Sequence, residues 1–231
     1  MKILCIAATK LELDPLIQRV KASAMFEEEG SVFIQPDFEL SFLVTGIGTA
    51  LTTFHLTKIL AGQDFDFVLN LGIAGSFVSS LKPGEVVYIK EEVFADLGIE
   101  DDGSVKTLFE AGLMDGNKFP FRNGKLASKT DPYLNKTLFE LRKGKGLTVN
   151  MASGSEISAK KFYAKYHSEV ESMEGAAVFY TCLMENVPFA EIRAISNVVG
   201  ERNKSKWKMS EAITRLSEVC YDIILEFIKN Q

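Results

Sequence analysis

The feature of this sequence that most limits its fold is a series of short apolar, β-branched runs separated by segments with helical spacing. The first run, residues 2–8, predicts a buried strand, and residues 10–20 predict a helix in which Pro15 is tolerable only near the first turn. Strands that alternate with helices favour an α/β fold, with a central mixed, mostly parallel sheet between two helical layers. A chain of 231 residues suits a single domain over 1–231.

The same reading places the other elements along the chain. Further strands are expected at 31–35, 39–45, 66–71, 85–94, 147–151 and 189–196, and helices at 49–60, 155–166, from Glu174 onward and at 207–229. Residues 98–146 show the weakest periodicity and many turn-forming residues, so only one helix, at 132–141, is expected there.

Composition excludes several classes of protein. The net charge is −5 with interspersed signs, which gives no footprint for nucleic acid or a membrane surface. The first apolar run is too short for a signal-peptide core, and no later stretch has the length of a membrane span, so a cytoplasmic protein is expected. Cys5, Cys182 and Cys220 sit among apolar neighbours and predict buried thiols; with only His55 and His167 besides, no metal site is expected.

Two glycine-rich segments, 45–49 and 70–76, follow strands of the predicted sheet. In open α/β sheets ligands bind beyond the carboxyl ends of strands, and glycines let backbone amides approach them. A helix after each segment would also direct its positive end at the ligand. Ordinary tight strand-to-helix turns are the alternative.

Polar residues also follow the predicted strands. Glu12 lies beyond the first strand, Glu171 and Glu174 bracket Met173, and Asn197 closes the strand at 189–196. Glu174 precedes a small apolar run, where an acidic residue can also cap a helix. Glu12 can equally be an exposed helix residue.

Several motifs together carry a family resemblance. These are Thr45-Gly-Ile-Gly48, Gly72-Ile-Ala-Gly75, Lys82-Pro-Gly-Glu85, Glu171-Ser-Met-Glu-Gly-Ala-Ala177 and Val187-Pro-Phe-Ala-Glu-Ile-Arg-Ala-Ile-Ser196. In this order they resemble the nucleoside phosphorylase and nucleosidase superfamily, which implies a phosphorylase/hydrolase-like three-layer fold. Among its hydrolytic branches the chain is similar to methylthioadenosine/adenosylhomocysteine nucleosidases and, through residues 196–207, to the futalosine hydrolases of an alternative menaquinone pathway.

The resemblance implies cleavage of a purine from ribose by water, without metal or organic cofactor. Departure of the base leaves an oxocarbenium-like ribose, which Glu174 would stabilise through the ribose hydroxyls. Glu12 matches the family's general base for the attacking water. Arg193 would hold Glu12 or the water, or be a member of a structural ion pair.

The resemblance also implies the wall of the substrate site. The implied residues are Ile47, Ala74, Gly75, Ser155, Ile157, Glu171, Met173, Arg193, Ser196 and Trp207. Met173 can instead belong to the core, and Trp207 can instead be an amphipathic position of the last helix. The family further suggests a homodimer in which a neighbour completes the pocket.

Asn197 bears on which base is bound. The adenosine-cleaving branch has an aspartic acid at this position, which can protonate the purine. An asparagine amide offers one donor and one acceptor, which suits a 6-oxopurine, and a mismatched buried polar pair costs about 1–3 kcal/mol. Hypoxanthine is therefore favoured over adenine, unless Asn197 only ends the strand.

The nucleophile follows from residues 8–12. Glu12 stands where phosphorylases of the superfamily bind phosphate, and a carboxylate would repel that anion, so water is favoured. Lys10 keeps a 6-oxopurine phosphorylase as an alternative, and Ile73 offers no hydroxyl to the water. Methylthioadenosine/adenosylhomocysteine cleavage and a catalytically silent nucleoside-binding protein are the other hypotheses.

Overall fold

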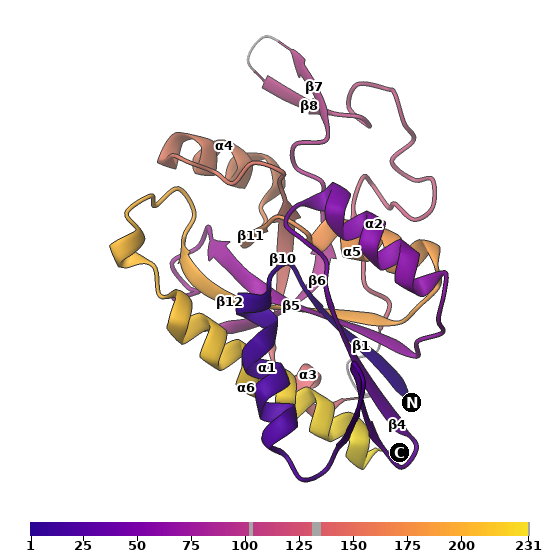
Figure 1. Cartoon of the computed structure of the whole chain (residues 1–231). Coiled ribbons are helices and arrows are strands. Elements are labelled where there is room, and N and C mark those ends of the chain that lie inside the picture. Colours follow the sequence, from indigo (N-terminus) through magenta and orange to yellow (C-terminus); the bar gives the residue numbers. More distant parts are fainter. Residues whose placement is uncertain (102–103, 131–134, 231) are drawn as a thin grey trace.

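The computed structural model describes residues 1–101, 104–130 and 135–230 and has a ten-stranded mixed sheet with helices on both faces (Figure 1). This confirms the predicted α/β class. The strands are β1 (Lys2–Ala7), β2 (Glu27–Glu29), β3 (Val32–Gln35), β4 (Phe38–Val44), β5 (Phe67–Ser76), β6 (Val86–Glu92), β9 (Leu126–Ala127), β10 (Arg142–Thr148), β11 (Val170–Ser172) and β12 (Phe189–Val198), with a separate hairpin of β7 (Gly98–Asp101) and β8 (Ser104–Thr107). The helices are α1 (Lys10–Ala22), α2 (Thr49–Leu60), α3 (Lys136–Glu140), α4 (Glu156–Tyr166), α5 (Gly175–Met184) and α6 (Met209–Lys229), with a short 3₁₀ helix at Lys204–Lys206.

The order of strands in the sheet explains where an interior can form. The path runs β11-β10-β6-β12-β5-β1-β4-β3-β2, and β4, β1, β5 and β12 are mutually parallel. Strand β6 is antiparallel to β12, and β11 also pairs with β5, where Glu171 lies opposite Gly75. Strands β5, β12, β6, β10 and β11 therefore close into a ring, so one face of β5 and β12 looks into a closed interior.

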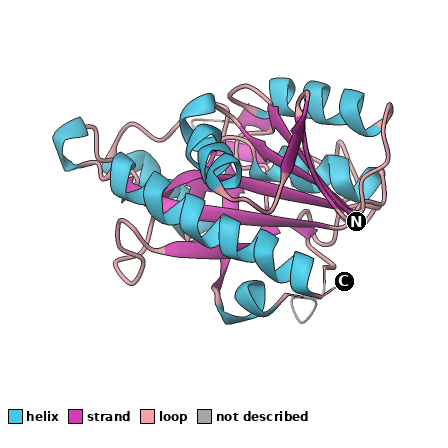
Figure 2. Cartoon of the chain, turned by 60° about the horizontal axis from the view of Figure 1, so that its bottom comes forward, coloured by secondary structure: helices cyan, strands magenta, loops and turns pink. Residues whose placement is uncertain are grey.

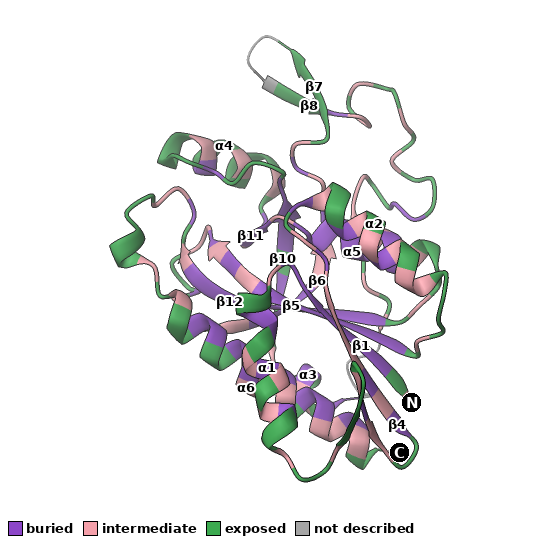
Figure 3. Ribbon diagram, viewed as in Figure 1, coloured by how far each residue is buried: buried purple, intermediate pink, exposed green. Residues whose placement is uncertain are grey.

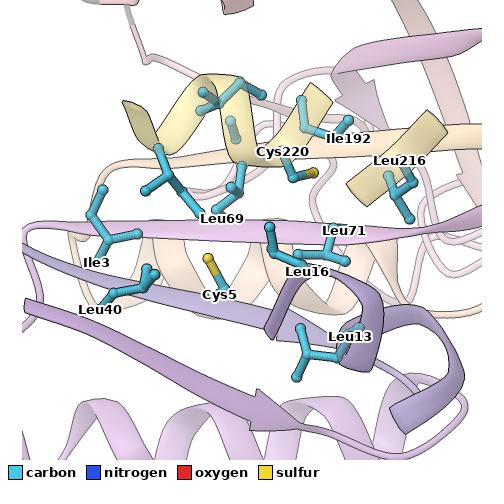
Figure 4. Packing of buried hydrophobic residues seen from close by; sticks show 14 of the residues in the cluster. Ile3, Cys5, Leu13, Leu16, Leu40, Leu69, Leu71, Ile192, Leu216 and Cys220 are labelled. Carbon is cyan, nitrogen blue, oxygen red and sulfur yellow. The ribbon is translucent and has the colours of Figure 1, made fainter. Parts of the chain in front are cut away.

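Alternation along β1 divides the core between two helical layers. Ile3 and Cys5 pack into the cluster that includes α1, α3 and α6, whereas Leu4 and Ile6 pack into the cluster that includes α2 and α5. Figure 2 shows helices on both sides of the strands, and Figure 4 shows the first cluster from close by. Because successive side chains of a strand point to opposite faces, a strand that is apolar throughout serves both layers.

The three cysteines are buried and unpaired, as predicted. Cys5 and Cys220 lie in the cluster under α6, and Cys182 lies in the cluster around α5. Burial raises the pKa of each thiol well above its ordinary value. They therefore serve as small apolar side chains.

Strand β5 corrects the prediction for residues 70–76. The segment is not a turn followed by a helix, because β5 continues to Ser76 and pairs with β12 along this length. The glycines have another role there: a Cβ at Gly72 would overlap Arg193 Nη1 and lie 3.2 Å from Glu12 Oε1. The first glycine segment does lead into a helix, because Gly48 is the N-cap of α2 with φ +92°.

Other differences are smaller. Strands β2 and β11 are three residues each, too short to give a periodic pattern. Helix α6 begins at Met209 rather than Trp207, and Pro15 lies in the second turn of α1, where its missing N–H faces the carbonyl of the exposed Leu11. Of the helix expected at 132–141, residues 136–140 form α3, while residues 132–134 lie outside the described residues.

Within the described ranges, no helix combines the length and the apolar character needed to cross a membrane. The longest, α6, has one apolar face against the sheet and one exposed face (Figure 3).

Candidate active site

A cavity of about 340 Å³ lies beyond the carboxyl ends of β1, β5 and β12. This is the edge at which ligands bind in open α/β sheets. Most of the residues predicted for the site line it: Glu12, Ile47, Ala74, Gly75, Glu171, Met173, Glu174, Ser196, Asn197 and Trp207. Ser155, Ile157 and Arg193 do not line it.

Glu12 is buried, so it is not an ordinary exposed helix residue. Its Oε2 accepts hydrogen bonds from Thr9 N at 3.1 Å and Thr9 Oγ1 at 2.7 Å, and its Oε1 accepts from Ile73 N at 3.0 Å. Ile73, which has no hydroxyl to offer, therefore contributes its backbone amide. These bonds fix the carboxylate at the wall of the cavity, which a general base requires.

Glu174 stands at the N-cap of α5, but its side chain makes no bond to its own helix. Oε1 instead accepts from Gly48 N at 3.0 Å, across the cavity mouth at the start of α2. Burial raises the pKa of this carboxyl, Arg193 and the Gly48 amide partly offset the rise, and Glu12 adds to it. Capping, the alternative role, is thus not what holds Glu174.

Arg193 lies beneath the two cavity carboxylates and is almost fully buried. Its Nε donates to Glu191 Oε1 at 2.6 Å, and Nη1 is 3.8 Å from Glu174 Oε2. Burial disfavours the charge, but Glu191, Glu174 and Glu12 outweigh burial and raise the pKa of Arg193, which stays protonated. Arg193 is therefore both a member of a structural ion pair and the cation that faces the cavity carboxylates.

Glu171 and Met173 form another part of the wall. Glu171 accepts from Ser153 N at 3.0 Å and from Ser153 Oγ at 2.5 Å, and burial raises the pKa of its carboxyl while Ser153 opposes the rise. Met173 is half-buried and lines the cavity, so it is not a plain core residue. The cavity wall therefore combines a carboxyl group, that of Glu171, with the apolar side chain of Met173.

Asn197 presents its amide to the cavity from within β12, which runs on to Val198. Ser196 Oγ donates to Asn197 Oδ1 at 2.7 Å, and Asn197 Nδ2 donates to Val198 O at 2.9 Å. Because a backbone carbonyl can only accept, the contact with Val198 O fixes Nδ2 as the donor end of the amide. A bulge in the pairing with β5 between Ile195 and Asn197 turns both side chains toward the cavity.

The segment after β12 covers one side of the cavity. Trp207 lies before α6 rather than within it, and its Nε1 donates to Glu201 O at 2.9 Å. Glu201, Arg202 and Trp207 all line the cavity. Trp207 is therefore a wall residue of the cavity.

Ser155 and Ile157 are placed differently from the prediction. Ser155 is the N-cap of α4 and accepts from Ser158 N, and Ile157, in the first turn of that helix, is 70% exposed. The preceding Ala152 and Ser153 line the cavity in their place. The loop between β10 and α4 therefore borders the cavity, whereas the first turn of α4 lies outside it.

Acidic side chains outnumber basic ones among the described residues that line the cavity. The described lining residues include four carboxylates, Glu12, Glu171, Glu174 and Glu201, and one cationic side chain, Arg202. Lys10 is exposed and is not among them. Within the described part of the chain, no group of three or more His, Cys, Asp or Glu side chains is arranged to hold a metal ion.

Two residues that hold the site together, Thr9 and Glu191, were not predicted from the sequence, although it contains a signal for each. Thr9 and Glu12 have the spacing of a helix capping box, which predicts that Glu12 folds back toward Thr9. Glu191 is two residues before Arg193 in a strand, and such residues share a face.

Comparison with known proteins agrees with this arrangement. The model of the phosphorylase superfamily matches residues 2–229, so the chain belongs to that family. A futalosine hydrolase of Thermus thermophilus is 32% identical over 192 residues, covering 80% of this chain and 81% of that protein. An aminodeoxyfutalosine nucleosidase of Campylobacter jejuni is 24% identical, covering 98% and 97%.

The fold itself recurs in solved structures. The native structure of a futalosine hydrolase of Helicobacter pylori superimposes with a TM-score of 0.80 at 18% identity, covering 98% of each chain. The chain therefore shares its fold with that solved structure.

Proposed function

We propose that this protein hydrolyses the N-glycosidic bond of a purine nucleoside, with futalosine as the substrate. The observation that carries the proposal is the pair of buried carboxylates, Glu12 and Glu174, held on one cavity by backbone amides of Ile73 and Gly48. Relatives named as futalosine hydrolases support the choice of substrate. The products would be hypoxanthine and the dehypoxanthinyl sugar product, a step in menaquinone biosynthesis.

The chemistry follows from what the two carboxylates can do. As the bond to the base breaks, positive charge develops on the ribose, and Glu174 would stabilise it while accepting from the ribose hydroxyls. Glu12 would orient a water molecule and take its proton as the water attacks the anomeric carbon. Met173 would supply an apolar surface against the sugar, and Trp207 would cover the base.

The charge of the cavity favours water over phosphate. Four carboxylates and one arginine line it, and a phosphate dianion beside Glu12 and Glu174 would be repelled. Lys10, which kept phosphorolysis open, faces solvent. A phosphate-dependent 6-oxopurine phosphorylase is therefore the weaker hypothesis.

The base is assigned through Asn197. With Oδ1 held by the Ser196 hydroxyl, the Nδ2 end has a hydrogen free to donate toward a 6-oxo group. An amide cannot protonate adenine at N7 as a carboxylic acid can. The alternative, an adenine-releasing nucleosidase, draws on relatives named methylthioadenosine/adenosylhomocysteine nucleosidase.

A homodimer is part of the proposal. Leu51 and Phe54 on α2, and Ile47 just before this helix, are all at least half exposed. Ile47 also lines the cavity, so the apolar stripe continues into the site. A second copy seated on this stripe would cover it and close the cavity, as symmetric dimers commonly do. We place the protein in the cytoplasm, where three free thiols are stable.

One assay tests the function. Purified protein is incubated with futalosine, inosine and methylthioadenosine, with and without phosphate, and both products are identified. Hydrolysis of futalosine to hypoxanthine and free sugar, at a rate indifferent to phosphate, is expected. A sugar phosphate would establish phosphorolysis, faster adenine release would establish the adenine-specific alternative, and tight binding without turnover would leave a nucleoside-binding protein.

A further inference from the structure

A second pair of carboxyls, Glu92 and Glu191, lies in the closed interior of the sheet beneath the cavity. Both are almost completely buried, and neither lines the cavity. Glu92 is on β6 and Glu191 on the neighbouring strand β12. A methyl group added at Gly175 would overlap Glu92 Oε1 and would lie 2.5 and 2.8 Å from the two oxygens of Glu191. The two carboxyls therefore face the same small space.

Their hydrogen bonds leave one oxygen of each carboxyl unpartnered. Glu92 Oε2 accepts from Thr148 Oγ1 at 2.9 Å, and Glu191 Oε1 accepts from Arg193 Nε at 2.6 Å. Glu92 Oε1 and Glu191 Oε2 are buried without a partner. Two ionised carboxylates would offer only acceptors here, whereas one proton would turn an unpartnered oxygen into a donor for the other.

We infer that Glu92 is held as a neutral acid whose proton is donated to Glu191, and that Glu191 thereby sets how much of the Arg193 charge reaches Glu174 and Glu12. This inference rests on the proposed function for its kinetic consequence. Glu191 is in this sense a positioning residue, since it acts on the reacting groups only through Arg193.

The location of the proton follows from the partners. Burial, and then the charge of Glu191, raise the pKa of Glu92 well above its ordinary value, with Thr148 and Arg193 opposing. Burial also raises the pKa of Glu191, but the directly bonded Arg193 opposes this rise, and the rise is smaller than that of Glu92. Glu191 therefore keeps its negative charge and Glu92 keeps the proton.

Among the residues that the structure describes, five ionisable groups interact around this interior: Glu12 from α1, Glu92 from β6, Glu174 at the start of α5, and Glu191 and Arg193 from β12. With Glu92 protonated, one guanidinium faces three carboxylates and cannot neutralise all of them. The negative charge of Glu191 raises the pKa of Glu174 directly. It also partly neutralises Arg193, whose positive charge lowers the pKa of Glu174. Without the negative charge of Glu191, Glu174 would ionise more easily.

Two isosteric substitutions separate the roles. Glu191→Gln removes a charge but keeps an acceptor for Arg193 Nε, whereas Glu92→Gln replaces a neutral acid by a neutral amide. In pH profiles of kcat/KM, Glu191→Gln is expected to move the acid limb to lower pH, raising activity there relative to the plateau about three- to tenfold. Glu92→Gln is expected to leave the acid limb in place. An unmoved limb in Glu191→Gln, or an equal shift in both variants, would overturn the inference.

An infrared titration tests the same inference without turnover. At neutral pH the wild-type protein should show the C=O stretch of a protonated carboxylic acid that is missing from Glu92→Gln. A wild-type spectrum without that difference contradicts the proton on Glu92. In the same titration, carboxyl groups of the Glu191→Gln variant should ionise at lower pH than those of the wild-type protein. An unchanged titration would contradict the role of Glu191. If wild-type protein cleaves no nucleoside, only the proposed function fails, because these spectra still decide the inference.

Discussion

Strands β5 and β12 have two faces of opposite character. Under α6, Leu69 and Leu71 of β5 pack with Ile192 of β12 and with Leu216 and Cys220 of the helix, as Figure 4 shows. The reverse face of the same strands carries other residues, namely Asn70, Gly72, Glu191 and Arg193, inside the closed ring of strands. Residues one position apart therefore lie in a dry apolar layer and in a buried charged layer.

The apolar face contributes to the stability of the fold, whereas the charged face contributes to the proposed chemistry. Burying apolar side chains under α6 stabilises the fold, whereas burying carboxylates costs free energy unless they are paired and hydrogen-bonded. Glu174 and Glu171 are held by amides and a hydroxyl, yet burial still raises the pKa of both. Disturbing the charged face should therefore impair activity, and disturbing the apolar face should impair stability.

The largest effect is expected on the charged face. Glu174→Gln should lower kcat/KM by about 10³-fold, because an amide carries no charge to stabilise the ribose cation. Burial of the ionised carboxyl opposes folding at neutral pH, since its folded-state pKa is raised, so the variant should be at least as stable as wild type there. Kinetics and thermal unfolding measure both.

Activity near the wild-type level would remove Glu174 from the site. Glu185→Gln, at the far end of the same helix and outside the cavity, is the matched control and should leave kcat/KM unchanged.

The next effect lies on the apolar face. Ile192→Ala should lower the free energy of unfolding by about 3 kcal/mol, because it leaves a cavity beneath α6. Its kcat/KM should stay near wild type while the protein is folded. Denaturant unfolding and kinetics check this, with Ile192→Val as a milder control of about 1 kcal/mol. A large loss of activity without loss of stability would erase the distinction between the faces.

A smaller effect is expected on substrate selectivity, from a substitution that leaves the apolar and the charged layer unchanged. Asn197→Asp places a group that can protonate a purine beside Ser196, and should shift the ratio of kcat/KM values from hypoxanthine toward adenine nucleosides by about 10–100-fold. Competition between futalosine and methylthioadenosine measures the ratio. An unchanged ratio would mean that Asn197 does not read the base.

The smallest effect concerns pH. Burial raises the pKa of Glu174, and the ionised form is the one that stabilises the cation, so kcat/KM should fall as pH drops through a value above that of an exposed glutamate. The pH profile of the free enzyme measures this limb. A limb at the ordinary value of an exposed glutamate would show that the interior does not perturb Glu174.

Most of the fold was predictable because the spacing of apolar residues along the sequence indicates which residues are buried. Helix α2 was expected at the bounds it has, and β1, β12 and α4 within two residues of theirs. The extension of β5 through Gly72 and Gly75 was not, since glycines usually mark turns. They are glycines because Arg193 and Val199 occupy the space that a Cβ would need.

The candidate site was predictable where residues lie at the carboxyl ends of strands, as Glu12 does just after β1 and Asn197 does near the end of β12. Ser155 and Ile157 were misplaced because the start of α4 decides which of its neighbours faces the cavity. The interior pair of Glu92 and Glu191 could not be predicted, because it depends on how β6 and β12 pair.

The sequence by itself determined the layered α/β fold, the strands that end at the site and the residue types available there, because these follow from local periodicity and side-chain chemistry. Only the tertiary structure decided which residues meet. Closure of the sheet through β11 and β5 brings Glu174 to Gly48, and the pairing of β1 with β5 brings Glu12 to Ile73, within hydrogen-bonding distance. Burial, which no local pattern encodes, then raises the pKa of Glu174.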